Sequence, residues 1–112
     1  MSEKNARAAG LIQHQVAEFL GRESNRTSLI TVTRVDLSPD MGKAIVFVTV
    51  YPDDKTKGAL DFLARKRDDV KDHIKQHSRL RRIPRISFEI DYGEKNRQHI
   101  DEMLAEDGTE KK

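Results

Sequence analysis

The chain contains no cysteine and no tryptophan, and its 112 residues include only four phenylalanines and two tyrosines. Without cysteine, a disulfide framework, a thiolate zinc site and a cysteine nucleophile are all excluded. No apolar run approaches the roughly 18 consecutive residues that a membrane span requires. The N-terminal stretch also lacks the apolar core of a secretory signal. We therefore expect a cytoplasmic protein that does not associate with membranes.

The charged residues are unevenly distributed along the chain. Hydrophobic and charged residues each make up 36% of the sequence, and the net charge is only +2. Residues 65–85 nevertheless carry nine basic and three acidic side chains, a net charge of +6, whereas residues 86–112 carry four basic and eight acidic ones, a net charge of −4. One concentrated basic block in a nearly neutral chain indicates a local anionic partner.

The spacing of apolar residues predicts a short series of helices and strands. The expected elements are a helix over about 6–21, strands over 29–37 and 43–51, a long helix over about 57–78, a strand over 85–92 and a short helix that uses Ile100, Met103 and Leu104. The alternation of the first strand shifts phase, which a bulge near Thr33 and Arg34 or burial on both faces would explain. Five consecutive charges from Arg65 to Asp69 predict that the long helix is kinked or divided.

This order predicts a two-layer α+β sandwich with a three-stranded sheet. Residues 1–104 are expected to form a single domain, and residues 105–112 a flexible C-terminal tail. The Ser38-Pro39-Asp40 segment should form the turn between the first two strands, and Ile86 and Phe88 should lie in the core.

Enzyme chemistry finds little support in the sequence. His73 and His77 have the i, i+4 spacing of a zinc-binding pair, but no third ligand is evident and Ile74 occupies the place of a general-base glutamate. Adjacent aspartates on a helix do not face each other, so the pair at 68–69 is better explained as surface charge. Phosphate-binding glycine loops are absent from the sequence. We expect a protein that is not an enzyme and that needs no cofactor or metal.

The basic block is better explained by contact with nucleic acid than by a merely solvated surface. Arginine suits bidentate contact with phosphate. The candidate RNA-binding residues are Lys66, Arg67, Lys71, Lys75, Arg79, Arg81, Arg82 and Arg85, and Arg34 could extend their surface. Because aromatic residues are scarce and none lies among these cations, the contacts should involve mainly the RNA backbone and its shape.

Two segments carry a family resemblance. "VDLSPDMGKAIVFVTV" resembles the Val-x-x-Ser-x-Asp and Ala-x-Val-x-Val pattern of the ribosome-binding factor A (RbfA) family, and "LRRIPRISFEID" resembles its Leu-Arg, Pro, Phe, Asp segment. The N-terminal helix with Arg7 fits as well, and the match covers about residues 6–104. One departure is that Lys66, Arg67 and Asp68 stand where the family usually carries Ala-x-Gly, so RNA contact there would depend on the Lys66 and Arg67 side chains.

The resemblance implies a type II K-homology (KH)-like fold in the order α-β-β-α(kinked)-β-α. It also implies a monomeric assembly factor that binds the immature small (30S) ribosomal subunit and its 16S ribosomal RNA (rRNA). Such a factor assists late maturation, rRNA processing and cold adaptation, and a maturation GTPase is expected to drive its release. Two alternatives remain open at this point. One is a protein-interaction adaptor without direct RNA binding, and the other is a hydrolase that uses the histidines or aspartates.

Overall fold

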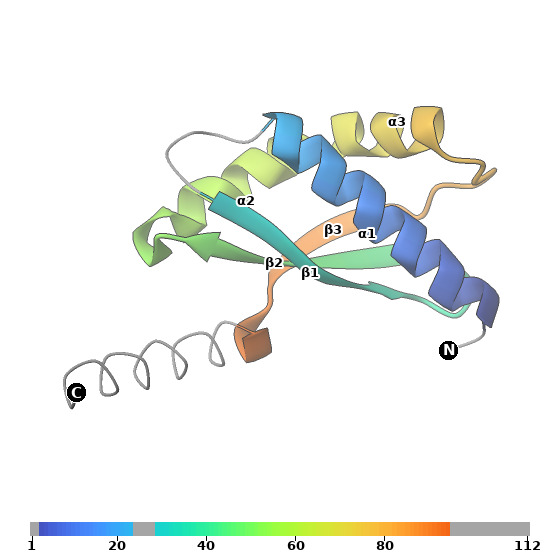
Figure 1. Ribbon diagram of the computed structural model, residues 1–112, viewed down its shortest axis with the longest axis horizontal. Coiled ribbons are helices and arrows are strands. Elements are labelled where there is room, and N and C mark those ends of the chain that lie inside the picture. The colour runs from blue at the N-terminus through green and yellow to red at the C-terminus, as the bar shows by residue number, and fades with distance from the viewer. Residues whose placement is uncertain (1–2, 24–28, 95–112) are drawn as a thin grey trace, which may run out of the picture.

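The computed structural model describes residues 3–23 and 29–94, and the side chains from residue 5 onward. Its elements are α1 (Glu3–Glu23), β1 (Leu29–Leu37), β2 (Lys43–Tyr51), a single 3₁₀ turn η1 (Asp53–Lys55), α2 (Thr56–Arg65), α3 (Arg67–His77) and β3 (Arg85–Ile90). The predicted helix at Ile100–Leu104 and the predicted tail at 105–112 lie outside the described residues. The observed order confirms the α+β class that the sequence predicted (Figure 1).

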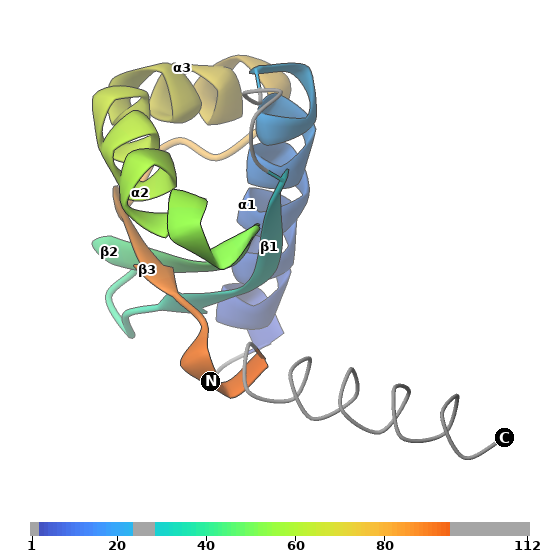
Figure 2. The same cartoon turned by 90° about the vertical axis from the view of Figure 1, so that its left-hand side faces the viewer.

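The three strands form one mixed sheet in the order β1-β2-β3. β1 and β2 pair antiparallel through a tight turn, whereas β2 and β3 pair parallel because the α2–α3 segment crosses over between them. The register places Lys43 beside Arg85 and Ile45 beside Ser87. Figure 2 shows α1, α2 and α3 on one side of this sheet, and none of these three helices covers the other side.

A bulge corrects the phase of β1, which is one of the two explanations that the sequence left open. The pairing with β2 shifts between Val32 and Arg34, so Thr33 is the extra residue. Ile30, before the bulge, and Val35 and Leu37, after it, consequently point to the same face and are all buried. The apolar residues of the strand are therefore directed to one core despite their irregular spacing.

The core lies between the helices and the inner face of the sheet. The apolar stripe of α1 supplies Ile12, Val16 and Leu20, which lie in one core with the alternating valines of β2, and α1 itself packs mainly against β1 and α3. Complete burial of each large aliphatic side chain stabilises the fold by about 1.5–3 kcal/mol before the entropy cost of ordering it. Ile86 is buried as expected, but Phe88 is only partly buried, at the margin of this core.

The turn between β1 and β2 is held by the residues that the sequence assigned to it. The Ser38 hydroxyl donates to Asp40 Oδ1 over 2.7 Å, and the Gly42 amide donates to the same oxygen over 2.9 Å. These two donors, the hydroxyl first, hold the pKa of Asp40 below its ordinary value. Met41 adopts a left-handed φ of 60°, which the compact turn requires. Ser38 is thus a structural residue of the turn.

Candidate RNA-binding surface

The long helical segment is divided at Lys66, as the run of charges predicted. Lys66 has φ −92° and ψ 3°, outside the helical region, and it separates α2 from α3. Backbone hydrogen bonds from Lys66 N to Phe62 O and from Val70 N to Lys66 O keep the helical i to i−4 pattern on both sides of this residue. Because φ is negative, the break needs no glycine. The departure from Ala-x-Gly is therefore compatible with a sharp change of helix direction.

Three of the candidate cations form a row along one flank of α3. Arg67, Lys71 and Lys75 follow one another at i, i+4 spacing, and all three are exposed. His73 lies on the side of α3 that packs against α1. Lys71 and Lys75 are each two residues from His73, which places them about 160° away around the helix axis. The row therefore faces away from α1.

Lys66 differs from this row. Its ammonium lies 3.7 Å from Asp69 Oδ2 and 4.0 Å from Glu23 Oε1, and its side chain is 34% exposed. These contacts turn it toward the C-terminal end of α1 and partly neutralise its charge. The structure thus separates Lys66 from Arg67, although the two are neighbours in sequence.

The connection from α3 to β3 carries Arg79, Arg81 and Arg82, all of which are exposed. The charge of Arg82 contributes to the lowered pKa of Asp40, which places this guanidinium near the β1–β2 turn. Within residues 3–23 and 29–94, none of the three forms a salt bridge. Their charge is consequently available to an anionic partner.

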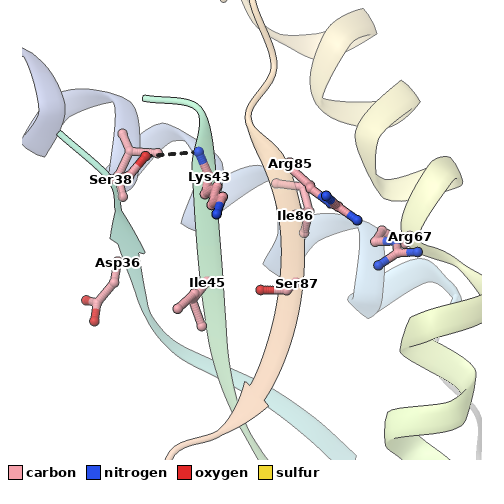
Figure 3. A pocket seen from close by; sticks show the side chains of 9 residues that line it. Asp36, Ser38, Lys43, Ile45, Arg67, Arg85, Ile86 and Ser87 are labelled. Carbon is pink, nitrogen blue, oxygen red and sulfur yellow. Dashed lines mark hydrogen bonds between the residues drawn. The ribbon is translucent and has the colours of Figure 1, made fainter. Parts of the chain in front are cut away.

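Arg85 and Arg67 line one pocket at the edge of the sheet. Both line a pocket of about 510 Å³, and Figure 3 shows their side chains extending toward one another from β3 and α3. Lys43, the register partner of Arg85, lines the same pocket. Sequence reasoning missed Lys43, because only strand pairing brings it beside the basic block. Its position immediately after a turn was the one available signal.

Arg34, the suggested extension of the surface, is held by neighbours on the uncovered face. Its guanidinium lies 4.0 Å from the centre of the Phe47 ring and 3.6 Å from Asp91 Oδ2, and it also bonds to Asp36 over 3.3 Å. The buried Asp91 carboxylate additionally accepts the Thr33 hydroxyl. The Thr33 bond first, then the Glu94 amide and the charge of Arg34, hold the pKa of Asp91 below its ordinary value. Arg34 therefore belongs mainly to an internal network.

The two histidines of α3 form a packed pair. Their rings stack with centroids 4.1 Å apart, and His73 also meets the ring of Phe19 edge-on at 5.6 Å. Arg22 Nη2 lies 2.9 Å from His73 Nδ1. Because a guanidinium only donates, Nδ1 accepts and the ring proton is on Nε2, which faces Glu18 Oε1 at 3.4 Å. Burial first, followed by the charges of His77 and Arg22, lowers the pKa of His73.

The Nδ1 atoms of both histidines have partners within the protein. His73 Nδ1 is occupied by Arg22, and His77 Nδ1 lies 2.9 Å from the His73 carbonyl oxygen. Across the two described ranges, no group of three or more potential metal-ligating side chains occurs. Among the same residues, no helix has the length and apolar character needed to cross a bilayer.

Comparison with known proteins agrees with this geometry. Residues 4–104 match the family model described as "Ribosome-binding factor A". The chain belongs to the ribosome-binding factor A family. The family member from Moorella thermoacetica is 30% identical over 110 residues, which span 94% of this chain and 90% of the relative. The one from Thermobifida fusca is 34% identical over 103 residues, which span 89% and 68% respectively.

Solved structures of the ribosome-binding factor A family share the fold. The crystal structure of the Thermus thermophilus protein matches with a TM-score of 0.67 and 26% identity, over 76% of this chain and 93% of that chain. A Thermus thermophilus RbfA homology model fitted into a cryo-electron microscopy map of a 30S–RbfA complex matches with a TM-score of 0.65 and 27% identity, over 72% and 88% respectively. The family assignment and the α+β fold expected from the sequence are thus both confirmed.

Proposed function

We propose that this protein binds the immature small ribosomal subunit and contacts its 16S rRNA through the cationic flank of α3 and the loop that follows. The observation that carries the proposal is the row of Arg67, Lys71 and Lys75, which lies on the flank of α3 turned away from α1. The loop arginines and Arg85 extend this cationic surface to the edge of the sheet. Ribosome binding is also what the family name describes, and one relative is represented in complex with the 30S subunit.

The cationic surface suits phosphate more than bases. Arginine and lysine contacts to phosphate supply affinity that is independent of sequence and sensitive to salt. The row carries no aromatic side chain on which bases could stack. The surface would therefore recognise the shape and backbone of folded rRNA, in keeping with a factor that monitors the state of assembly.

The wider role belongs to the same proposal. The protein would act as a monomer in the cytoplasm, without catalysing a reaction, and it would assist late subunit maturation, rRNA processing and growth in the cold. It would leave the subunit through the action of a maturation GTPase. The resemblance to the family supports these features, and the absence of an evident triad or phosphate loop in the sequence favours a binding role.

Co-sedimentation with precursor and mature small subunits at two salt concentrations tests the proposal. We expect retention on precursor subunits that exceeds retention on mature ones and falls steeply with salt. Equal retention on both would contradict a role in maturation. A second assay uses protein-free fragments from the 3′ region of 16S rRNA. A pure protein-interaction adaptor would not bind these fragments, so their binding separates the two functions.

A further inference from the structure

The uncovered face of the sheet has a pocket at the end where β2 and β3 begin. Two rows of register partners line it: Lys43 with Arg85, and Asp36 with Ile45 and Ser87. These side chains share one face because strand partners and alternate residues point the same way. Figure 3 shows Ile45 and Ser87 side by side on neighbouring strands, with Arg85 and Arg67 beyond the edge of β3. At about 510 Å³, the pocket is within the range of small-molecule sites.

The two rows differ in chemistry. Lys43, Arg85 and Arg67 supply three cations at one margin, and no salt bridge within the described ranges neutralises them. The next row has the partly buried, apolar Ile45 in its centre. Asp36 and Ser87 flank Ile45 with a carboxylate and a hydroxyl. The pocket thus combines an anion site with an apolar surface that has polar groups on both sides.

The dimensions of the rows fit one nucleotide. Neighbouring strands are about 4.8 Å apart, so Asp36 and Ser87 are separated by roughly 10 Å, with Ile45 between them. The cationic row lies two residues along the strands, or roughly 7 Å away. This displacement is similar to that between the phosphate and the base of a single nucleotide. A planar base would cover Ile45 while its phosphate reached the three cations.

We propose that this pocket binds one unpaired nucleotide of the rRNA, an inference that rests on the proposed RNA binding and adds base selectivity to it. Lys43, Arg67 and Arg85 bind the phosphate, and the base lies on Ile45. Asp36 only accepts hydrogen bonds, and its bonds to Arg34 leave part of its acceptor capacity available. Cytosine and adenine offer Asp36 an exocyclic amino group, whereas the single donor of uracil, N3–H, lies between two carbonyl oxygens that a carboxylate repels. The pocket therefore favours cytosine and adenine over uracil.

The test is an NMR titration of the full chain with the hexanucleotides C₆, A₆ and U₆. We expect shifts of the Lys43, Ile45 and Ser87 amides, and binding of C₆ and A₆ about fivefold tighter than binding of U₆. Asp36→Asn presents an amide that also donates, so it should bring the affinities for C₆ and U₆ to within about twofold of each other. Undiminished discrimination in this variant would overturn the role of Asp36.

A second pair of variants tests whether the empty space of the pocket is needed for nucleotide binding. Ser87→Phe fills it without changing charge, and Thr31→Phe places the same bulk on the uncovered face of β1 outside the pocket. Ser87→Phe should weaken C₆ binding at least about fivefold, whereas Thr31→Phe should not. Suppose that both phenylalanine variants bind C₆ as tightly as the parent, while Arg81→Glu/Arg82→Glu no longer binds subunits. The pocket is then not the nucleotide-binding site, and the proposed function survives. If the parent binds neither hexanucleotide nor subunit, both proposals fail.

Discussion

Arg67 and Arg85 begin two different elements, α3 and β3, yet their side chains line one pocket and extend toward each other. Two guanidinium groups repel at short range unless an anion lies between them or water screens them. A phosphate bound in this pocket would be attracted by both charges at once.

The Arg67→Glu/Arg85→Glu variant should therefore bind precursor small subunits at least about tenfold more weakly, because two charge-assisted contacts are lost and two repulsions are introduced. Lys55→Glu/Lys57→Glu is the matched control. It makes the same change of charge at exposed positions near the start of α2. Binding is measured by sedimentation, and folding by circular dichroism. An equal loss of binding in both variants would show that the overall charge, and not these two positions, accounts for the effect.

The loop arginines should account for part of the salt dependence. If about six phosphates are neutralised, the slope of log K against log salt concentration should be about −4 to −5. Arg81→Gln/Arg82→Gln should make this slope shallower by roughly 1–2 and leave the melting temperature unchanged, since both side chains are exposed. A slope that stays the same in the double variant would exclude both residues from phosphate contact.

The neutral His73 should make stability depend on pH. Its pKa is lowered from the ordinary 6.5, so the unfolded chain takes up a proton before the folded one does. The free energy of unfolding should therefore fall as pH drops below about 6.5, by at most about 1.4 kcal/mol per pH unit, until the lowered folded-state pKa is reached. Urea titrations at several pH values measure this slope.

Two variants isolate the contribution of His73. His73→Gln should flatten the dependence between about pH 7 and 5, and Arg22→Gln should reduce it by removing a nearby positive charge. His14→Gln on the exposed side of α1 should retain the parental dependence. A parental slope in His73→Gln would assign the acid sensitivity to other groups.

The bond between Thr33 and Asp91 should stabilise the bulge of β1. Thr33→Val or Asp91→Asn should lower the free energy of unfolding by about 1–3 kcal/mol, because a buried carboxylate loses its donor or its charge. In a double-mutant cycle the two losses should not be additive. The Asp91 contribution is present at neutral pH and is lost only as pH falls below the ordinary 3.8 toward the lowered folded-state pKa. Additive losses would show that the two groups act independently.

Local features of the sequence were sufficient for the elements and for the family. The phase shift around Thr33 marked the place of the bulge, with burial on both faces as the alternative. The run of charges from Arg65 to Asp69 predicted a kink or a division of the long helix. Both signals depend on side-chain periodicity within one segment. The turn formed by Ser38 and Asp40 was equally local. The sequence predicted that Phe88 lies in the core, whereas it is only partly buried. Alternation along the strand determines which face of the sheet a residue is on, but β3 is an edge strand, and its face is less completely covered.

The grouping of charges was decided by the tertiary structure. From the sequence, Lys66 and Arg67 were both predicted to bind RNA. In the structure, the end of α2 turns Lys66 toward Glu23, whereas Arg67 begins α3 at the opposite flank. Strand pairing brought Lys43 to Arg85, and it engaged Arg34 with Asp91. Composition and periodicity determine how many cations a segment carries and which element holds them. Which of them share a surface depends on contacts between residues distant in sequence, and only the folded chain sets those contacts.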